Sequence, residues 1–144
     1  MIATDGSDAS RQAAEIGINL ARQSCSRITV VYVIDIHRLI NSHGYTSFPG
    51  MKDRLLETMQ REGESATSEI ERMASEAGVQ CDKLMAQGDP SDELLRLSEE
   101  SGMDLLVLGS IGRSGLEKFL LGSVAEKVVR HSKIPVVLVP FGKA

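Results

Sequence analysis

The sequence predicts an α/β fold in which five parallel strands form one sheet with helices on both faces, as in Rossmann-like proteins. Short runs rich in Ile, Val and Leu alternate with longer stretches whose apolar residues recur at helical spacing. The resulting order, βαβαβαβαβ, requires a parallel sheet, because each helix returns the chain to the end where the previous strand began. The length of 144 residues fits one domain, which we expect to span residues 1–144.

The first part of the chain is predicted to form two strands joined by a helix. Residues 2–4 form a short strand, and Asp5, Gly6 and Ser7 follow it as a turn that starts a helix. Small and apolar residues then share one helical face as far as about residue 22. Residues 28–34 form an apolar run, as expected of a strand that is covered on both faces.

The middle of the chain is predicted to hold a loop, a long helix and a third strand. Residues 35–50 contain histidines, glycines and a proline without periodicity, which indicates one long loop. Residues 81–86 form a modest strand. Residues 52–77 form an amphipathic helix whose inner stripe consists of Leu55, Leu56, Met59, Ala66, Ile70, Met73 and Ala77.

The last part of the chain is predicted to add two helices and two strands. Asp89 caps a helix that has Pro90 at its first position. Residues 105–108 form the fourth strand, and residues 134–139 form the fifth. Between them, residues 123–126 (Ser-Val-Ala-Glu) fit a capping box that opens the last helix.

Two loops of this sheet carry unusual residues. In open parallel sheets, ligands bind beyond the carboxyl ends of the strands, at the point where the strand order reverses. Residues 4–7 (Thr-Asp-Gly-Ser) follow the first strand, and a glycine-rich stretch over residues 109–122 follows the fourth. If the order reverses between these two strands, the two loops flank a single crevice.

The glycine-rich stretch favours phosphate binding on physical grounds. Its glycines, Gly109, Gly112 and Gly122, match neither the Walker A nor the dinucleotide spacing. Glycines let backbone N–H groups approach an anion, and Gly122 with Ser123 lies at a helix N-terminus, where the helix dipole favours phosphate. The same residues also fit an ordinary loop before a helix that Ser123 caps, and both interpretations remain open.

Asp5 and Val33 are candidates for the nucleoside end of such a ligand. Asp5 could accept hydrogen bonds from a ribose or a base, although Asp-Gly is also common in turns. Val33 lies near the end of the second strand, where it is either a core residue or a wall for an adenine.

Charge is unevenly distributed along the chain. The net charge of −4 argues against a general nucleic-acid binder. Residues 1–108 hold 10 Lys and Arg against 18 Asp and Glu, whereas residues 109–144 hold 6 against 2. This cationic segment is consistent with a small anionic ligand and equally with a chance excess on an exposed helix.

Composition predicts the compartment and the absence of metal chemistry. No apolar run approaches the roughly 20 residues that span a bilayer, so we expect no membrane partner. The start of the chain has no signal-peptide pattern. The 2 cysteines and 3 histidines have no metal or redox spacing. We therefore expect a reduced cytoplasmic location and no metal site.

Three stretches of the chain together resemble the universal stress protein family. They are the Thr-Asp-Gly-Ser turn at residues 4–7, the G-x2-G-x9-G-S spacing from Gly109 to Ser123, and the tail over residues 122–137. The resemblance covers nearly the whole chain. It implies the ATP-binding branch of the family and a fold like that of the adenine nucleotide α-hydrolases, with the strand order reversing between the first and fourth strands.

The resemblance also implies which residues contact the nucleotide. The adenosine lies along the end of the first strand, with Asp5 near the ribose and Val33 touching the adenine. The phosphates follow the glycine-rich loop to the start of the last helix, with Arg113 close by. The residues implied to bind are Ala3, Thr4, Asp5, Val33, Gly109, Gly112, Arg113, Gly122, Ser123 and Val124.

The fifth strand is expected to lie at an edge of the sheet. Its apolar core, Val136–Val139, is bounded by Pro135 and Pro140. Exposed edges need protection or a partner, and flanking prolines are one form of protection. The family resemblance implies the other form, a homodimer that pairs through this strand.

Three classes of function follow from these residues. The first is a regulatory stress-response module that holds ATP, the second an enzyme that hydrolyses ATP or transfers its phosphoryl group, and the third a dimeric scaffold without nucleotide. Phosphoryl transfer needs a positioned base and cationic clamps, and the glycine loop offers no Walker lysine. We therefore expect slow hydrolysis at most, no catalytic residue, and any Mg²⁺ to be carried by the phosphates.

Overall fold

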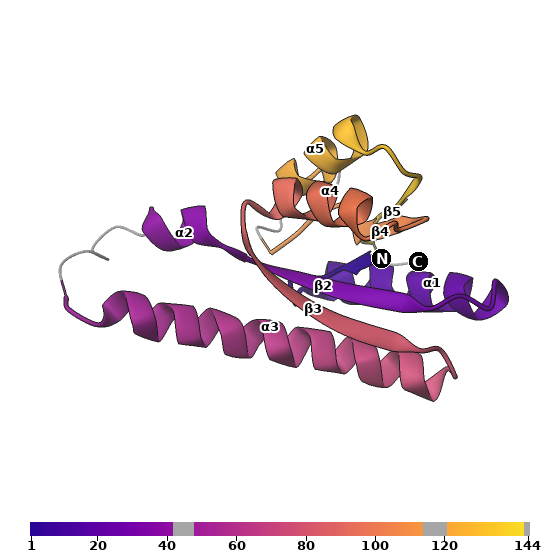
Figure 1. Cartoon of the computed structure of the whole chain (residues 1–144), viewed down its shortest axis with the longest axis horizontal. Helices are drawn as coiled ribbons and strands as arrows, with labels where there is room; N and C mark the ends of the chain where they lie inside the picture. Colours follow the sequence, from indigo (N-terminus) through magenta and orange to yellow (C-terminus); the bar gives the residue numbers. More distant parts are fainter. Residues whose placement is uncertain (42–47, 114–120, 143–144) are drawn as a thin grey trace.

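The computed structural model describes residues 1–41, 48–113 and 121–142, which form a five-stranded parallel sheet (Figure 1). The strand order is β3-β2-β1-β4-β5, so the order reverses between β1 and β4. Both the predicted fold class and the predicted reversal point are confirmed. The strands are β1 (Ile2–Ala3), β2 (Ile28–Asp35), β3 (Cys81–Gly88), β4 (Leu106–Gly109) and β5 (Val136–Val139).

Helices cover both faces of the sheet. In Figure 1, α1 and α3 lie on one side of the sheet, and α4 and α5 lie together on the other. This is the arrangement expected when right-handed crossovers occur on either side of the reversal point. The helices are α1 (Asp8–Gln23), α2 (Ile36–Ile40), α3 (Met51–Glu76), α4 (Pro90–Glu100) and α5 (Ser123–His131).

The prediction of one long loop over residues 35–50 is wrong. Asp35 still belongs to β2, and the short helix α2 follows it directly. The Asp35 carboxylate caps α2 by accepting a hydrogen bond from the backbone N–H of Arg38 at 3.1 Å. A helix of five residues is too short to show periodicity, which is why the sequence pattern did not indicate it. Residues 42–47 of the predicted loop lie outside the described residues.

Besides β2, which also includes Asp35, three strands differ in length from the prediction. β1 ends at Ala3, although the Thr4 N–H continues the pairing by donating to the Val31 carbonyl at 2.9 Å. β3 runs two residues further than predicted, to Gly88, because its polar side chains lie at the edge of the sheet and leave no apolar signature. β5 begins only at Val136, because Pro135 has no N–H to donate.

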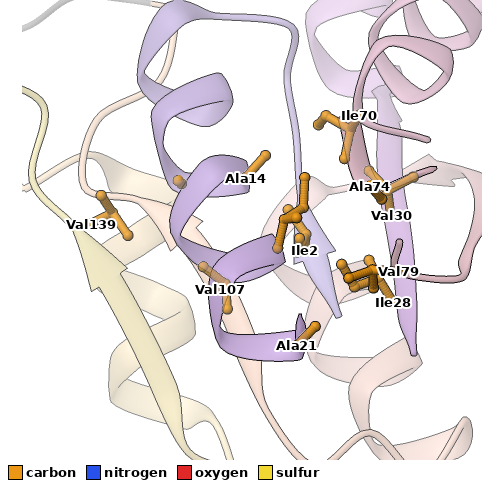
Figure 2. Packing of buried hydrophobic residues seen from close by; sticks show 12 residues of the cluster. Ile2, Ala14, Ala21, Ile28, Val30, Ile70, Ala74, Val79, Val107 and Val139 are labelled. Atoms are coloured by element: carbon orange, nitrogen blue, oxygen red, sulfur yellow. The ribbon is translucent and has the colours of Figure 1, made fainter. Parts of the chain in front are cut away.

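One core lies between the sheet and the helices α1 and α3. In Figure 2, Ile2 lies between the alanines of α1 and the residues Ile70 and Ala74 of α3. A Cβ atom on Gly17 of α1 would lie 2.7 Å from Cδ1 of Ile2, so the helix and the strand approach as closely as a glycine allows. The labelled core residues are Ile2, Ala14, Ala21, Ile28, Val30, Ile70, Ala74, Val79, Val107 and Val139.

The long helix α3 buries less than its predicted stripe. Of that stripe only Ala66 and Ile70 are buried, whereas Leu55, Leu56, Met59, Met73 and Ala77 are partly exposed. Gly63, Thr67 and Ala74 complete the buried face. The first half of the helix is therefore mostly exposed, and its residues Leu56 and Met59 pack against a small cluster formed by Tyr32, Ile34 and Ala66.

A second core lies on the opposite face of the sheet, under α4 and α5. Successive strand residues point to opposite faces, so Ala3 and Val31 belong to this core while their neighbours Ile2 and Val30 belong to the first. The buried members of the second core are Ala3, Val31, Leu94, Leu97, Leu106, Leu108, Ala125 and Val128.

Asp89 caps α4 as predicted, and its environment stabilises the ionised carboxylate. Its side chain accepts a hydrogen bond from the backbone N–H of Asp92 at 3.0 Å, and Lys127 Nζ lies 3.6 Å from the same oxygen. Burial alone raises the pKa of Asp89, but the Ser91 hydroxyl, the Asp92 N–H and Lys127 outweigh it, and the net pKa is lowered.

We expect Asp89→Ala to lower the free energy of unfolding by about 1 kcal/mol at neutral pH, the usual cost of losing a helix cap. Because the folded pKa is lowered, this contribution is present above the unfolded pKa of about 3.9 and is lost as the pH falls through the folded pKa. Urea unfolding from neutral to acidic pH measures it. Asp92→Ala is the control, since it removes the 2.7 Å ion pair with Lys127 but keeps the cap. Equal losses in the two variants would contradict the prediction.

Candidate functional site

A cleft of about 470 Å³ opens at the carboxyl ends of β1, β2 and β4, where the strand order reverses. All ten residues that the sequence analysis selected line it, so the two predicted loops do flank one crevice. These residues are Ala3, Thr4, Asp5, Val33, Gly109, Gly112, Arg113, Gly122, Ser123 and Val124. Their roles in binding stay predictions.

The first loop is a tight turn held by its own side chains. Gly6 has a φ of +79°, a backbone conformation that favours glycine. The Gly6 N–H donates to the Thr4 hydroxyl at 3.1 Å, and the Ser7 N–H donates to the Asp5 carboxylate at 2.9 Å. Ser7 then caps α1 by accepting the Ser10 N–H at 3.2 Å. The predicted turn and helix start are confirmed, and one edge of the cleft is fixed before any ligand enters.

The second loop is anchored where it leaves β4. The Ser110 N–H donates to the Val139 carbonyl of β5 at 2.9 Å, and the Ser110 carbonyl accepts the Gly122 N–H at 2.8 Å. These bonds bring the start of the loop beside the start of α5. Residues 114–120, which include Gly115, lie outside the described residues.

The glycines of this loop make close contacts with the protein itself. A Cβ on Gly112 would lie 2.8 Å from Oδ2 of Asp5, and one on Gly109 would lie 3.2 Å from the Ala9 carbonyl oxygen. A Cβ on Gly122 would lie 3.2 Å from the Ser110 carbonyl oxygen. The role that the sequence predicts for these glycines is to let a phosphate approach the backbone. The shape of the loop requires them as well, independently of any ligand.

The start of α5 differs from the prediction. Gly122 is the N-cap and Ser123 the first helical residue, so the predicted capping box with Ser123 as cap is wrong. Glu126, its predicted partner, instead pairs with Arg130 at 2.8 Å, one helical turn further on. The first bond of the helix joins the Glu126 N–H to the Gly122 carbonyl. The N–H groups of Ser123, Val124 and Ala125 therefore have no acceptor among the described residues, and all three residues line the cleft.

Arg113 is held on the α3 side of the cleft. Its backbone N–H donates to Oδ2 of Asp5 at 2.9 Å and its Nε donates to the Asp5 carbonyl at 2.7 Å. Nη1 donates to Glu62 of α3 at 2.9 Å. Burial alone lowers the pKa of Arg113, but the hydrogen bond to Glu62 and the neighbouring charges outweigh it and raise the pKa above its ordinary value. The guanidinium thus remains charged, and it donates hydrogen bonds to the backbone carbonyl of Asp5 and to the carboxylate of Glu62.

The other described cations of the basic segment are also paired. Lys127 lies 2.7 Å from Asp92, Arg130 2.8 Å from Glu126, and Lys133 2.9 Å from Glu99. Lys118 and Lys143 lie outside the described residues. Acidic residues, Glu126 within the segment and Asp92 and Glu99 outside it, therefore offset the charge of these described cations, and the backbone N–H groups of α5 are the clearer attraction for an anion.

The cleft has further lining residues that the sequence analysis missed. Asp35 and Arg38 contribute from the end of β2 and from α2. The position of Asp35, directly after an apolar strand, is the same signal that singled out Asp5. Three further residues, Pro90 and Leu94 of α4 and Leu108 of β4, supply an apolar wall, which only the three-dimensional fold reveals.

The described residues hold neither a membrane-spanning helix nor a metal-binding cluster. No helix in those parts of the chain is long and apolar enough to cross a membrane. Within the same ranges, 1–41, 48–113 and 121–142, no three His, Cys, Asp or Glu side chains gather where they could hold a metal ion.

An open parallel sheet with helices on both faces and a glycine-lined cleft at its reversal point defines the class of Rossmann-like α/β folds. Within that class, the chain belongs to the universal stress protein family, whose family model matches residues 1–140. The universal stress protein MJ0531 of Methanocaldococcus jannaschii is 35% identical over 139 residues, which cover 96% of this chain and 79% of that protein. The universal stress protein YxiE of Bacillus subtilis is 30% identical over 143 residues and 96% of both chains.

Solved structures share the fold. That of the protein MJ0577 matches with a TM-score of 0.85 at 23% identity, over 99% of this chain and 95% of that one. A universal stress protein in complex with cAMP matches with a TM-score of 0.68 at 27% identity, over 96% and 92% of the two chains. A family member from Arabidopsis thaliana with AMP bound gives 0.68 at 19% identity, over 96% and 88%.

Proposed function

We propose that this chain binds an adenine nucleotide in the cleft at the reversal point, and that this nucleotide is ATP. The chain would then belong to the ATP-binding branch of its family. The observation that carries the proposal is the start of α5, where the N–H groups of Ser123, Val124 and Ala125 have no acceptor among the described residues and line the cleft beside the glycine loop. Helix N-termini of this kind bind phosphate. Solved relatives with cAMP and AMP bound support an adenine nucleotide as the ligand.

The residues of the cleft fit the parts of such a nucleotide. Gly122, Ser123 and Val124 hold the phosphates, and the exposed Ser123 hydroxyl adds a donor. Val33 and the apolar wall from α4 receive the adenine, while Ala3 and Thr4 follow the adenosine. Each Asp5 carboxylate oxygen accepts one backbone N–H and keeps a second lone pair for a ribose hydroxyl. The cleft volume of about 470 Å³ lies within the usual range of small-molecule sites.

We further propose that the chain acts as a regulatory module in the stress response, with slow hydrolysis at most. Phosphoryl transfer needs a positioned base and a cationic clamp on the transferred group. Here the Asp5 carboxylate is bound to two backbone N–H groups, and the Arg113 guanidinium is bound to Asp5 and Glu62. Bound ATP supplies its triphosphate as the recognised anion, and the phosphates carry any Mg²⁺.

The proposal includes a homodimer of single-domain chains, spanning residues 1–144, in the cytoplasm. β5 is the edge strand next to β4, and Val136, Val137 and Leu138 are partly exposed. Pairing of two such edges would satisfy the open N–H and C=O groups of both strands. Light scattering at micromolar concentration tests the dimer, and a strictly monomeric mass would contradict it.

The experiment that tests the binding proposal identifies the ligand that copurifies with the chain. Freshly purified protein is denatured, and mass spectrometry measures the released small molecules and their stoichiometry. About one ATP per chain supports a tight binding module, whereas ADP alone favours the hydrolase alternative. No released nucleotide, followed by no binding in an ATP titration, would overturn the proposal and leave a dimeric scaffold.

A further inference from the structure

Three residues from distant parts of the sequence form a connected set of hydrogen bonds at the cleft. Arg113 follows β4, Asp5 follows β1, and Glu62 lies on α3. Arg113 donates its backbone N–H and its Nε to Asp5 at 2.9 and 2.7 Å, and its Nη1 to Glu62 at 2.9 Å. We call this set the Asp5–Arg113–Glu62 clamp. It joins both loops of the cleft to the long helix.

The backbone around the clamp leaves room for it. A Cβ on Gly112 would lie 2.8 Å from Asp5 Oδ2, so the residue beside Arg113 has no side chain where the carboxylate docks. A Cβ on Gly6 would lie 3.3 Å from Arg113 Nη2 and 3.6 Å from Cβ of Ala66 on α3. The guanidinium therefore passes over the first loop towards α3, and the local glycines accommodate its path.

The clamp fixes a part of the glycine loop, at Arg113, that the sheet does not hold. At its start, the loop is tied to β5 and to the N-cap of α5 through Ser110. Three residues after Ser110, Arg113 links the loop to Asp5 and Glu62 by hydrogen bonds. A planar guanidinium can donate to two acceptors in fixed directions at once, which a lysine ammonium on a flexible stem does not reproduce.

We propose that Glu62 is a positioning residue for the nucleotide site. It acts through Arg113, which it holds on the α3 side, and so keeps residues 110–113 and the Asp5 carboxylate in the geometry that binds the ligand. Arg113 accordingly serves as a clamp and not as a direct phosphate ligand. This inference rests on the proposed nucleotide function, and it adds to that function a residue outside both loops.

The test compares two similar ion pairs on α3. Glu62→Ala breaks the clamp. The matched control is Glu69→Ala, which removes another glutamate of α3 and breaks its 3.1 Å ion pair with Arg11 of α1, away from the cleft. The affinity for ATP is measured by calorimetry, and hydrogen exchange of the Arg113 amide is measured by NMR without nucleotide. We expect Glu62→Ala to raise the Kd about threefold to fivefold, as for a partly exposed ion pair, and to speed the exchange. Glu69→Ala leaves both unchanged, and Glu62→Gln, which keeps an acceptor oxygen, partly restores both.

A second variant separates the clamp from a direct phosphate contact. Arg113→Lys keeps the positive charge but loses the forked geometry, so we expect its Kd to match that of Arg113→Ala. A Kd for Arg113→Lys close to the wild-type value, or equal behaviour of Glu62→Ala and Glu69→Ala, would overturn the inference. If the wild-type chain binds no ATP, the proposed function fails by itself. The exchange rate of the Arg113 amide then tests the clamp independently of nucleotide binding. Faster exchange in Glu62→Ala than in the wild type supports the clamp, and an unchanged rate overturns it.

Discussion

Gly112→Ala is expected to weaken ATP binding by at least about tenfold. The added Cβ would lie 2.8 Å from Oδ2 of Asp5, closer than real Cβ atoms come, so the carboxylate must leave the position where it accepts the Arg113 N–H. A hydrogen bond to a charged group contributes about 1.5–3 kcal/mol, which corresponds to roughly 10- to 150-fold in affinity. Only the fraction of variant molecules that restores the wild-type loop geometry would bind ATP, and the apparent affinity falls in proportion to that fraction. Isothermal titration of wild type and variant with ATP measures the change.

The control for this prediction is Gly142→Ala. A Cβ at Gly142 meets nothing within 4 Å, so the same chemical change is made where the described structure leaves open space. We expect its ATP affinity to equal that of the wild type. Equal affinities for all three proteins would show that the contact between Gly112 and Asp5 does not shape the site.

Leu106→Ala is expected to lower the free energy of unfolding by about 2–5 kcal/mol, as for other large-to-small changes in a core. Leu106 is 0% exposed and lies in β4, between β1 and β5, where it packs in the second core with residues of α4 and α5. Since single domains unfold with about 5–15 kcal/mol, this is a large part of the total. Urea unfolding should show a lower midpoint at an unchanged slope.

Leu121→Ala provides the comparison for the core prediction. Leu121 is 40% exposed, so its truncation should change the free energy of unfolding by no more than about 0.5 kcal/mol. A loss at Leu106 as small as the loss at Leu121 would mean that Leu106 is not packed in the second core as described above.

Most of the fold could be predicted because each long element has its own periodic signature. The apolar run of β2 and the amphipathic pattern of α3 are long enough to be recognised without tertiary information. The five residues of α2 are not, and the polar end of β3 at the sheet edge leaves no apolar signal. Short or edge elements depend on their neighbours, and the sequence does not say which neighbours those are.

The positions of the candidate site residues could also be predicted, but their interactions could not. The rule that ligands bind at strand ends placed Asp5 and Gly112 at one crevice without any distance being known. The partner of Arg113, Glu62, is 51 residues away in sequence, and counting charges by segment cannot reveal such a pair. At α5, the local motif suggested Ser123 as the cap. Gly122, one residue earlier, has the extended backbone of an N-cap and takes that place.

The hydrogen bond between the Ser110 N–H and the Val139 carbonyl has a thermodynamic consequence. It joins the glycine loop to the last residue of β5, the strand through which we propose that two chains pair. If this bond transmits a shift of the loop to the edge strand, ligand occupancy and subunit association are linked, and each then changes the other by the same factor. A nucleotide that strengthens dimerisation by a given factor also binds the dimer more tightly than the monomer by that same factor. The oligomeric state would then report the nucleotide concentration.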